Sequence, residues 1–274
     1  MSQRLRPPRL RLRRPRIRPP QLPAETQPAE AQELRMSLLE HLEELRNRLF
    51  KAAIALVIGT AVGFIFAGDV LEFLKRPYGA EPFIALGPTD SVVAYFRVAL
   101  MIGGILAIPV ITYQVLMFVL PGLTSKERRV LLMALPAITL LFIVGVLFTW
   151  FILIPPAIGF FEGFQPTLFR PQWTADRYLG FVTALLFWMG VAFETPLIFF
   201  VLALLGFVKP RSLLKNWRIA VVGASIAAAL ITPTVDPVNM FLVMGPLLAL
   251  YALSIALVAL ARRIAGLRSD TESA

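Results

Sequence analysis

Six long runs of apolar residues constrain this chain more than any other feature of its sequence. They cover residues 49–67, 92–120, 130–154, 178–205, 219–231 and 238–261. A bilayer core about 30 Å thick needs about 20 helical residues, so five runs are long enough to cross a membrane. The fifth run would make a helix only about 20 Å long, and we expect thinned bilayer or sheltering neighbours beside it. The sequence therefore predicts an all-α integral membrane protein with six transmembrane helices, the fifth of them short.

The composition excludes several other classes of protein. Hydrophobic residues make up 57% of the chain and charged residues 16%, whereas soluble domains carry about 25% charged residues. The net charge of +10 depends largely on residues 4–18, which hold eight arginines and no acid, so we do not expect a nucleic-acid partner. The chain has no cysteine, and its one histidine is His41, so disulfides and multi-histidine metal sites are excluded within one chain. Phosphate-binding loops and hydrolase motifs are missing as well, and we expect no cofactor, no metal and no enzymatic activity.

The chain divides into four predicted segments. Residues 1–35 form a basic Pro/Arg-rich extension with too few apolar residues for a core, so we expect it to be disordered. It is either an extension upstream of a true start at Met36 or a basic arm that binds anionic headgroups. Residues 36–48 have leucines on one helical face and predict an amphipathic helix at the membrane interface. Residues 49–262 form the six-helix transmembrane domain, and residues 263–274 a cytoplasmic tail.

The charge of the connecting segments alternates along the chain. The segment before the first run, the connections 121–129 and 206–218, and the residues after the last run carry an excess of basic residues. The connections 68–91, 155–177 and 232–237 carry no such excess. Basic loops stay in the cytoplasm, which predicts that both termini are cytoplasmic.

A single carboxylate lies near the middle of the fourth apolar run. Glu194 stands in the segment Gly190-Val-Ala-Phe-Glu-Thr-Pro196, and an ionisable side chain in the bilayer core costs about 2.5–3.5 kcal/mol on insertion scales. Pro196 cannot donate a helical hydrogen bond to the carbonyl of Ala192, so the helix can kink there. Glu194 therefore either faces a cavity or a partner protein, or is a protonated group bonded to Thr195 or the freed carbonyl.

Three further acids lie at the ends of apolar runs, and each has a structural interpretation. Glu44 stands four residues before Arg48 and can form an ion pair within a helix. Glu127 closes a capping box, and Asp236 precedes a proline as a helix N-cap would. Alternatively, Glu44 and Glu127 are two interfacial carboxylates available to an incoming cation.

Two glycines in the first apolar run permit close helix packing. Gly59 and Gly63 form a GxxxG motif. The motif allows two helix backbones to approach, although one such motif in an apolar run is weak evidence by itself.

Five ordered motifs together resemble the TatC family, the multispanning receptor subunit of the twin-arginine protein translocase. They are His41-Leu-Glu-Glu-Leu-Arg-Asn-Arg-Leu49, Pro109-Val-Ile-Thr-Tyr-Gln114 followed by Phe118, Lys126-Glu-Arg-Arg129, Phe193-Glu-Thr-Pro196 and Thr232-Pro-Thr-Val-Asp-Pro237. The resemblance covers about 38–262. It does not extend to the arginine-rich segment before Met36, and members of the family can have a shorter spacer before the acid at position 236.

The resemblance implies a function as well as a fold. Members of the family receive folded precursors with twin-arginine signal peptides and export them independently of the Sec pathway, using the proton-motive force and no nucleotide. They assemble as hetero-oligomers with the single-span subunits TatA and, in many systems, TatB. The implied fold is a cupped arrangement of six helices in the bacterial cell membrane with both termini inside.

The resemblance also implies roles for particular residues. For signal-peptide recognition the matching positions are Glu44, Arg46, Phe118 and Glu127. Carboxylates suit this task because they bind guanidinium groups through charge-assisted, bidentate hydrogen bonds. For the intramembrane site, where partner helices dock, the matching positions are Glu194 and Pro196, and for the last external loop the matching position is Asp236.

Two other functions remain open on the sequence. A proton-coupled small-molecule transporter would use Glu194 as proton carrier and would need further polar side chains facing it. The apolar runs offer few of these, namely Thr139, Thr149, Thr183 and Ser225. A membrane enzyme would need a nucleophile beside a base, and no such pair is visible.

Overall fold

The computed structural model describes residues 26–79, 82–119, 125–168, 171–204, 206–232 and 236–272. Side chains are described within these ranges from Leu39 to Arg262, apart from residues 119, 125–128, 130 and 131. The chain divides into two compact units, Met1–Arg46 and Asn47–Ala274. Helix α1 (Thr26–Lys75) begins in the first unit and continues into the second.

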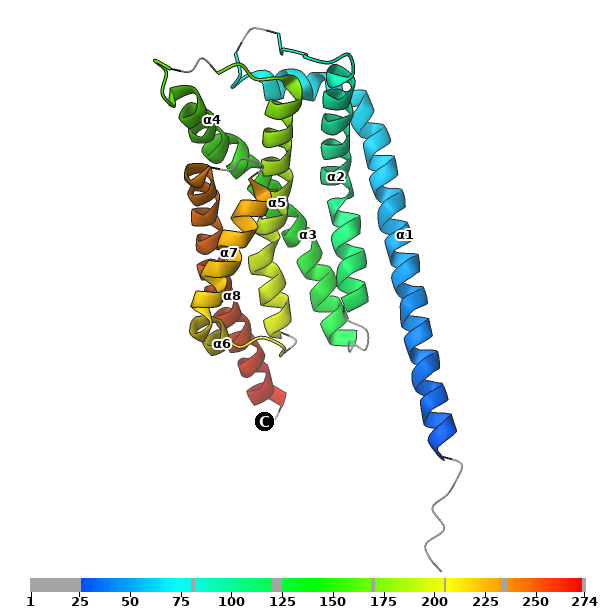
Figure 1. Ribbon diagram of the computed structural model, residues 1–274. Coiled ribbons are helices and arrows are strands. Elements are labelled where there is room, and N and C mark those ends of the chain that lie inside the picture. Colours follow the sequence, from blue (N-terminus) through cyan, green and yellow to red (C-terminus); the bar gives the residue numbers. More distant parts are fainter. Residues whose placement is uncertain are drawn as a thin grey trace, which may run out of the picture. The chain divides into compact units, whose positions relative to one another are not determined.

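The regular elements of the described residues are helices, and they follow the apolar runs (Figure 1). After α1 come α2 (Asp90–Val119), α3 (Ser125–Phe148), a π-helical turn η1 (Thr149–Leu153), α4 (Ile154–Gly163), α5 (Ala175–Leu204), α6 (Pro210–Lys215), α7 (Trp217–Ile231) and α8 (Pro237–Glu272). Five stretches are long and apolar enough to cross a membrane: Leu39–Lys75, Asp90–Phe118, Leu132–Gly163, Ala175–Leu204 and Pro237–Arg262. The sixth apolar helix, α7, is shorter. The predicted all-α class, with six apolar helices and a short fifth one, is confirmed.

Helix α1 is longer than the predicted segments suggest. It is continuous over residues 36–48, which were predicted as an interfacial helix, and over the first apolar run. Its start at Thr26 places Pro28 in the first turn, where the missing N–H has no helical partner to lose. Residues 1–25 lie outside the described part. The segment boundaries at residues 35 and 48, the tail after residue 262, and the cytoplasmic termini stay predictions.

The connection 155–177 contains a helix that we did not expect from the sequence. Helix α4 follows η1 directly and starts with Pro155 and Pro156 in its first turn. The first four N–H groups of a helix have no intrahelical partner, so these prolines are compatible with a helix start and do not by themselves indicate a loop. The hydroxyl of Thr149, at the start of η1, donates to the carbonyl of Gly145 at 2.8 Å.

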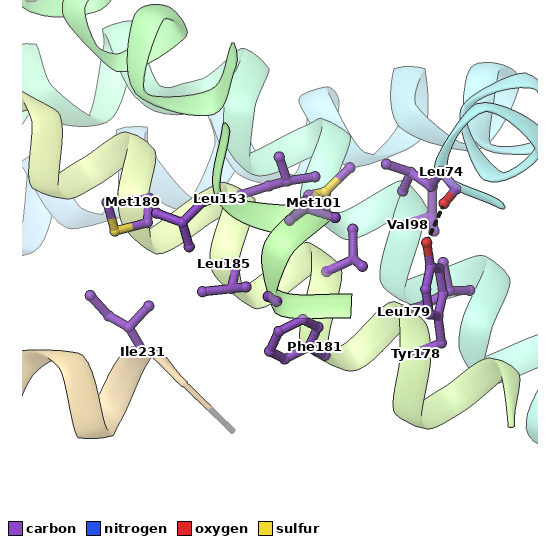
Figure 2. Packing of buried hydrophobic residues seen from close by; sticks show 14 of the residues in the cluster. Leu74, Val98, Met101, Leu153, Tyr178, Leu179, Phe181, Leu185, Met189 and Ile231 are labelled. Carbon is purple, nitrogen blue, oxygen red and sulfur yellow. Dashed lines mark hydrogen bonds between the residues drawn. The ribbon is translucent and has the colours of Figure 1, made fainter. Parts of the chain in front are cut away.

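Helix α5 contributes most to the core of the second unit, where it packs against α2, α3 and α8. Its fully buried side chains include Tyr178, Leu179, Val182 and Met189. Figure 2 shows the hydroxyl of Tyr178 donating to the carbonyl of Leu74 near the end of α1, at 2.8 Å. Close packing of this kind replaces the hydrophobic effect as the force between helices in lipid.

Helices α1 and α2 approach closely at small residues. A Cβ added at Gly59 would lie 2.6 Å from the carbonyl oxygen of Gly103, and one added at Gly63 would meet the carbonyl oxygen of Ala99. The GxxxG motif of the first apolar run therefore serves as a contact surface, and its partner is α2.

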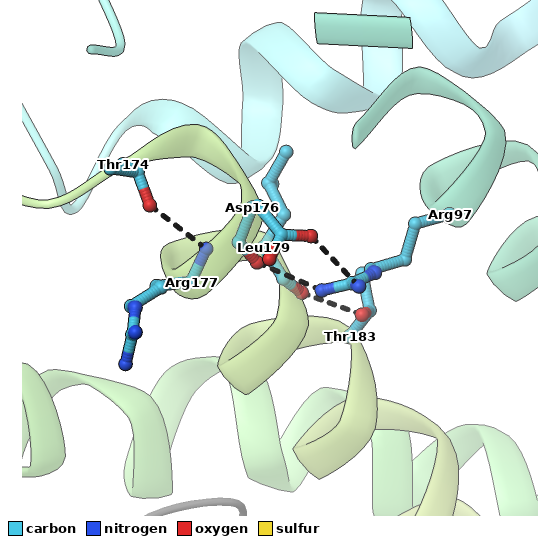
Figure 3. Close-up of polar contacts among 6 residues, drawn as sticks. All are labelled: Arg97, Thr174, Asp176, Arg177, Leu179 and Thr183. Carbon is cyan, nitrogen blue, oxygen red and sulfur yellow. Dashed lines mark hydrogen bonds and ion pairs between the residues drawn. The ribbon is translucent and has the colours of Figure 1, made fainter. Parts of the chain in front are cut away.

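A charged pair joins the beginnings of α2 and α5 (Figure 3). Arg97 Nη2 lies 2.9 Å from Asp176 Oδ1, and Arg97 Nη1 donates to the main-chain oxygen of Asp176 at 2.8 Å. Gly180, one turn further along α5, has no side chain to obstruct the guanidinium. The pair explains how an arginine is accommodated near the beginning of the second apolar run.

We expect Arg97→Gln to destabilise the protein more than Asp176→Asn does, because only the first removes the bond to the main-chain oxygen. The two side chains are 35% and 43% exposed, so solvent screens the ion pair and its coupling energy should stay below about 1 kcal/mol. A double-mutant cycle of unfolding in mixed micelles measures both quantities. An Asp176→Asn cost equal to that of Arg97→Gln would contradict the role given to the main-chain bond.

Candidate functional site

The carboxylate of Glu194 is buried between α5 and α2. The residue is 5% exposed, and Thr112 of α2 is 8% exposed. The hydroxyl of Thr112 lies 3.4 Å and 3.3 Å from the two carboxylate oxygens. A hydroxyl donates one hydrogen bond at a time, so Thr112 satisfies only part of the acceptor capacity of this carboxylate.

The orientation of Glu194 follows from the packing of α5 against α3. A Cβ added at Gly190 would lie 2.7 Å from the ring of Phe142, and one added at Gly145 would lie 2.8 Å from Phe193. These glycines let the two helices approach closely, with the ring of Phe193 packed against that of Phe148 at 5.2 Å. Since Phe193 is held against α3, the next side chain along α5 projects toward α2.

Prolines lie close to both members of this pair along their helices. Pro109 stands three residues before Thr112 inside α2, and Pro196 stands two residues after Glu194 inside α5. Neither can donate a helical hydrogen bond to the carbonyl four residues earlier. The pair therefore lies in a stretch where both helices have fewer internal hydrogen bonds than regular α-helices.

Thr112 is a residue of the candidate site that was not predicted from the sequence. The sequence predicted Thr195 or the carbonyl of Ala192 as the partner of Glu194, and both belong to the same helix as Glu194. Thr112 stands within the motif Pro109-Val-Ile-Thr-Tyr-Gln114, so a signal was present. Nothing in the sequence shows, however, that its side chain meets α5 rather than lipid.

The other hydroxyls that a transporter would need bond to their own helices. Each donates to the carbonyl four residues earlier: Thr139 to Leu135, Thr149 to Gly145, Thr183 to Leu179 and Ser225 to Val221. Such local bonds satisfy a hydroxyl without a partner helix, although Ser225 Oγ also lies 3.2 Å from the Sδ of Met244 on α8. The proton-relay interpretation of Glu194 thus gains no support from these four residues.

The residues assigned to signal-peptide recognition lie in different parts of the structure. Glu44 is 37% exposed with His41 Nδ1 at 3.9 Å, and the exposed Arg46 donates to Glu43 Oε1 at 3.1 Å. Both belong to the first unit. The half-buried Phe118 ends the described side chains of α2 in the second unit, and the side chain of Glu127 lies outside the described residues. That the four residues form one surface stays a prediction.

Another residue at the end of α2 has a contact to α1 within the second unit. Arg48 Nη1 donates to the amide oxygen of Gln114 at 3.4 Å. Gln114 belongs to the same motif as Thr112. The polar side chains of this motif therefore contact both α1 and α5.

Asp236 has the capping geometry that its position before Pro237 indicates. Its Oδ1 accepts from the main-chain N–H of Asn239 at 2.7 Å, and its Oδ2 accepts from the amide of Asn239 at 3.1 Å. Helix α8 begins at Pro237. This geometry explains the residue structurally, and its role in the external loop stays a prediction. No cluster of three His, Cys, Asp or Glu able to hold a metal ion occurs within the described residues.

The fold and this site define a class: a polytopic helical membrane protein with a carboxylate buried between two of its transmembrane helices. The family model "Sec-independent protein translocase protein (TatC)" matches residues 40–246. The chain therefore belongs to the TatC family. It is a membrane component of a protein transport system, the twin-arginine translocase, which works with other Tat subunits.

Relatives and solved structures agree with this family. The Sec-independent protein translocase protein TatC of Synechocystis sp. is 37% identical over 219 residues, 80% of this chain and 86% of the relative. The chloroplastic TATC of Arabidopsis thaliana is 38% identical over 79% of this chain and 64% of its own length. A crystal structure described as the twin arginine translocase receptor TatC superposes with a TM-score of 0.72 at 37% identity, over 81% of this chain and 99% of that one. The resemblance drawn from the five motifs is confirmed.

Proposed function

We propose that this chain is the receptor subunit that binds twin-arginine signal peptides of folded precursors for Sec-independent export. The observation that carries the proposal is the likeness to the solved twin arginine translocase receptor over four-fifths of the chain. The proposed setting is the bacterial cell membrane with both termini in the cytoplasm, where the basic connecting segments belong. The proton-motive force drives transport, and the subunit has no catalytic step.

Recognition of the signal peptide rests on two interfacial carboxylates. Glu44 and Glu127 each receive one guanidinium of the arginine pair, since guanidinium and carboxylate match in charge and in hydrogen-bond geometry. The partial exposure of Glu44 supports this role. Arg46 and Phe118 complete the surface, the first through its ion pair with Glu43 and the second by apolar contact.

The intramembrane site binds partner helices. The apolar part of the signal peptide passes toward Glu194 and Pro196, and single-span subunits, TatA and in some systems TatB, place a polar side chain there. Partial satisfaction of the carboxylate by Thr112 supports this step, because a buried acceptor with spare capacity favours any donor that a partner brings. The assembly is then a hetero-oligomer within membrane lipid, with Asp236 at the external end.

We expect Glu44→Lys and Glu127→Lys each to weaken binding of a twin-arginine peptide about tenfold or more, since an attractive contact becomes a repulsive one. Crosslinking of a photoreactive signal peptide to the full chain in membranes measures this. Glu40→Lys is the matched control, because it makes the same charge change one turn earlier on α1. Binding that falls equally in Glu40→Lys and Glu44→Lys would show a general charge effect and remove the specific assignment.

A further inference from the structure

A polar pocket and an apolar groove meet at one side chain near the end of α1. The polar pocket has a volume of about 460 Å³ and is lined by Asp69, Glu72, Phe73, Lys75, Arg76 and Gly79. The apolar groove has a volume of about 300 Å³ and is lined by side chains of α1, α2, α3, η1 and α5. Phe73 lines both, so the two spaces are neighbours with opposite chemistry.

The aromatic contacts of Phe73 define the boundary between these spaces. Its ring stacks on Trp150 of η1 with centroids 4.5 Å apart. The guanidinium carbon of Arg76 lies over the same ring, 5.0 Å from its centroid. A cation is therefore held where the apolar surface ends, and contact with the ring limits the directions in which it can point.

The groove itself is lined only by apolar side chains. Leu74 and Met101 form part of its wall, together with Ile105, Val146 and Leu186. An apolar space of this kind does not hold water. If it stayed empty, the side chains that line it would lose dispersion contacts. In a bilayer the molecules at hand to fill it are lipid acyl chains.

The charges of the pocket match a zwitterionic headgroup. Two acids, Asp69 and Glu72, and two bases, Lys75 and Arg76, surround it. All four lie at the end of the membrane-spanning stretch Leu39–Lys75 or directly after it, at the depth where lipid headgroups lie. A phosphate suits the basic pair and an ammonium group suits the acidic pair.

We propose that this composite space binds one phospholipid with a primary ammonium headgroup, a phosphatidylethanolamine, with an acyl chain in the groove. The phosphate lies beside Arg76 and the ammonium donates to the carboxylates of Asp69 and Glu72. An anionic lipid would bring its excess negative charge against these acids. A trimethylammonium lipid would bring no N–H donor for them.

The headgroup, and not the acyl chain, determines which lipid is retained. An acyl chain in the groove exchanges one apolar environment for another, so little hydrophobic free energy distinguishes it from chains in the bulk bilayer. Charge-assisted hydrogen bonds from an ammonium group to two carboxylates of the protein depend on which headgroup is present, so they distinguish one lipid from another. Selectivity for the headgroup is therefore the property to test.

The experiment reconstitutes the full chain in vesicles of equal parts phosphatidylethanolamine, phosphatidylcholine and phosphatidylglycerol with identical acyl chains. After extraction and delipidation in detergent, the lipids retained on the protein are quantified. We expect phosphatidylethanolamine to be enriched about threefold or more over the other two. The enrichment should disappear in Asp69→Asn/Glu72→Gln and persist in Glu162→Gln, an exposed acid on α4 outside both spaces.

A second measurement locates the acyl chain. Trp150 is followed by fluorescence in a variant carrying Trp173→Phe, Trp188→Phe and Trp217→Phe, and brominated acyl chains serve as quenchers. Quenching of Trp150 by brominated phosphatidylethanolamine should exceed quenching by the brominated choline and glycerol lipids, and Arg76→Gln should abolish the difference. Equal retention of the three lipids, or equal quenching by them, would overturn the proposal.

Discussion

Glu194→Ala should abolish export of twin-arginine precursors while leaving the protein as stable as the wild type, or more stable. A buried carboxylate is costly in the bilayer, and its loss frees Thr112 to bond to its own helix. We therefore expect this gain to offset the cavity that the shorter side chain leaves. If partner helices bind there, loss of about 1.4 kcal/mol of interaction already lowers their affinity tenfold. Export of a folded reporter and unfolding of the purified variant measure the two effects separately.

Two matched variants make this result specific. Thr112→Val removes the hydroxyl that lies 3.3 Å from the carboxylate and should reduce export partially. Thr183→Val removes a buried hydroxyl that lies on α5, as Glu194 does, but donates to the carbonyl of Leu179. We expect export by this variant to stay near the wild-type level. Normal export by Glu194→Ala, in membranes where the variant is present at the wild-type amount, would remove Glu194 from the proposed mechanism.

Gly63→Ala and Gly68→Ala should change stability in opposite directions. At Gly63 the new Cβ would meet the carbonyl oxygen of Ala99 on α2, a main-chain atom that cannot rotate away. Separating two packed helices costs about 1–3 kcal/mol. At Gly68 nothing lies within 4 Å of an added Cβ, so alanine gains up to about 1 kcal/mol through its higher helix propensity. Both glycines belong to α1, and thermal unfolding in one detergent compares them directly.

Opposite signs would show that the α1–α2 contact determines the result at Gly63. Gly59→Ala should behave like Gly63→Ala, since its Cβ would lie 2.6 Å from the carbonyl oxygen of Gly103. Stabilisation by all three alanines would mean that helix propensity dominates throughout α1 and that the close contact is absent.

The apolar runs located the membrane helices because each run is a local property of the chain. A segment in lipid must satisfy its main-chain hydrogen bonds internally, so length and hydropathy alone predict a helix. Capping is also local, because Asp236 caps α8 through the N–H of Asn239, only three residues away. The sequence could therefore predict this cap. The sequence prediction failed where one local pattern is compatible with two kinds of backbone. Pro155-Pro156 is compatible with the predicted loop and also with the helix start that the structure shows.

From the sequence alone came the number, order and approximate limits of the six apolar helices, the family, and the identity of the acid buried within the fourth run. The tertiary structure decided which side chain meets that acid, since Thr112 lies 82 residues away along the chain. It also paired Arg97 with Asp176 and placed Gly63 against Ala99. Hydropathy and helical periodicity act over a few turns, whereas these contacts depend on how neighbouring helices rotate and pack against each other.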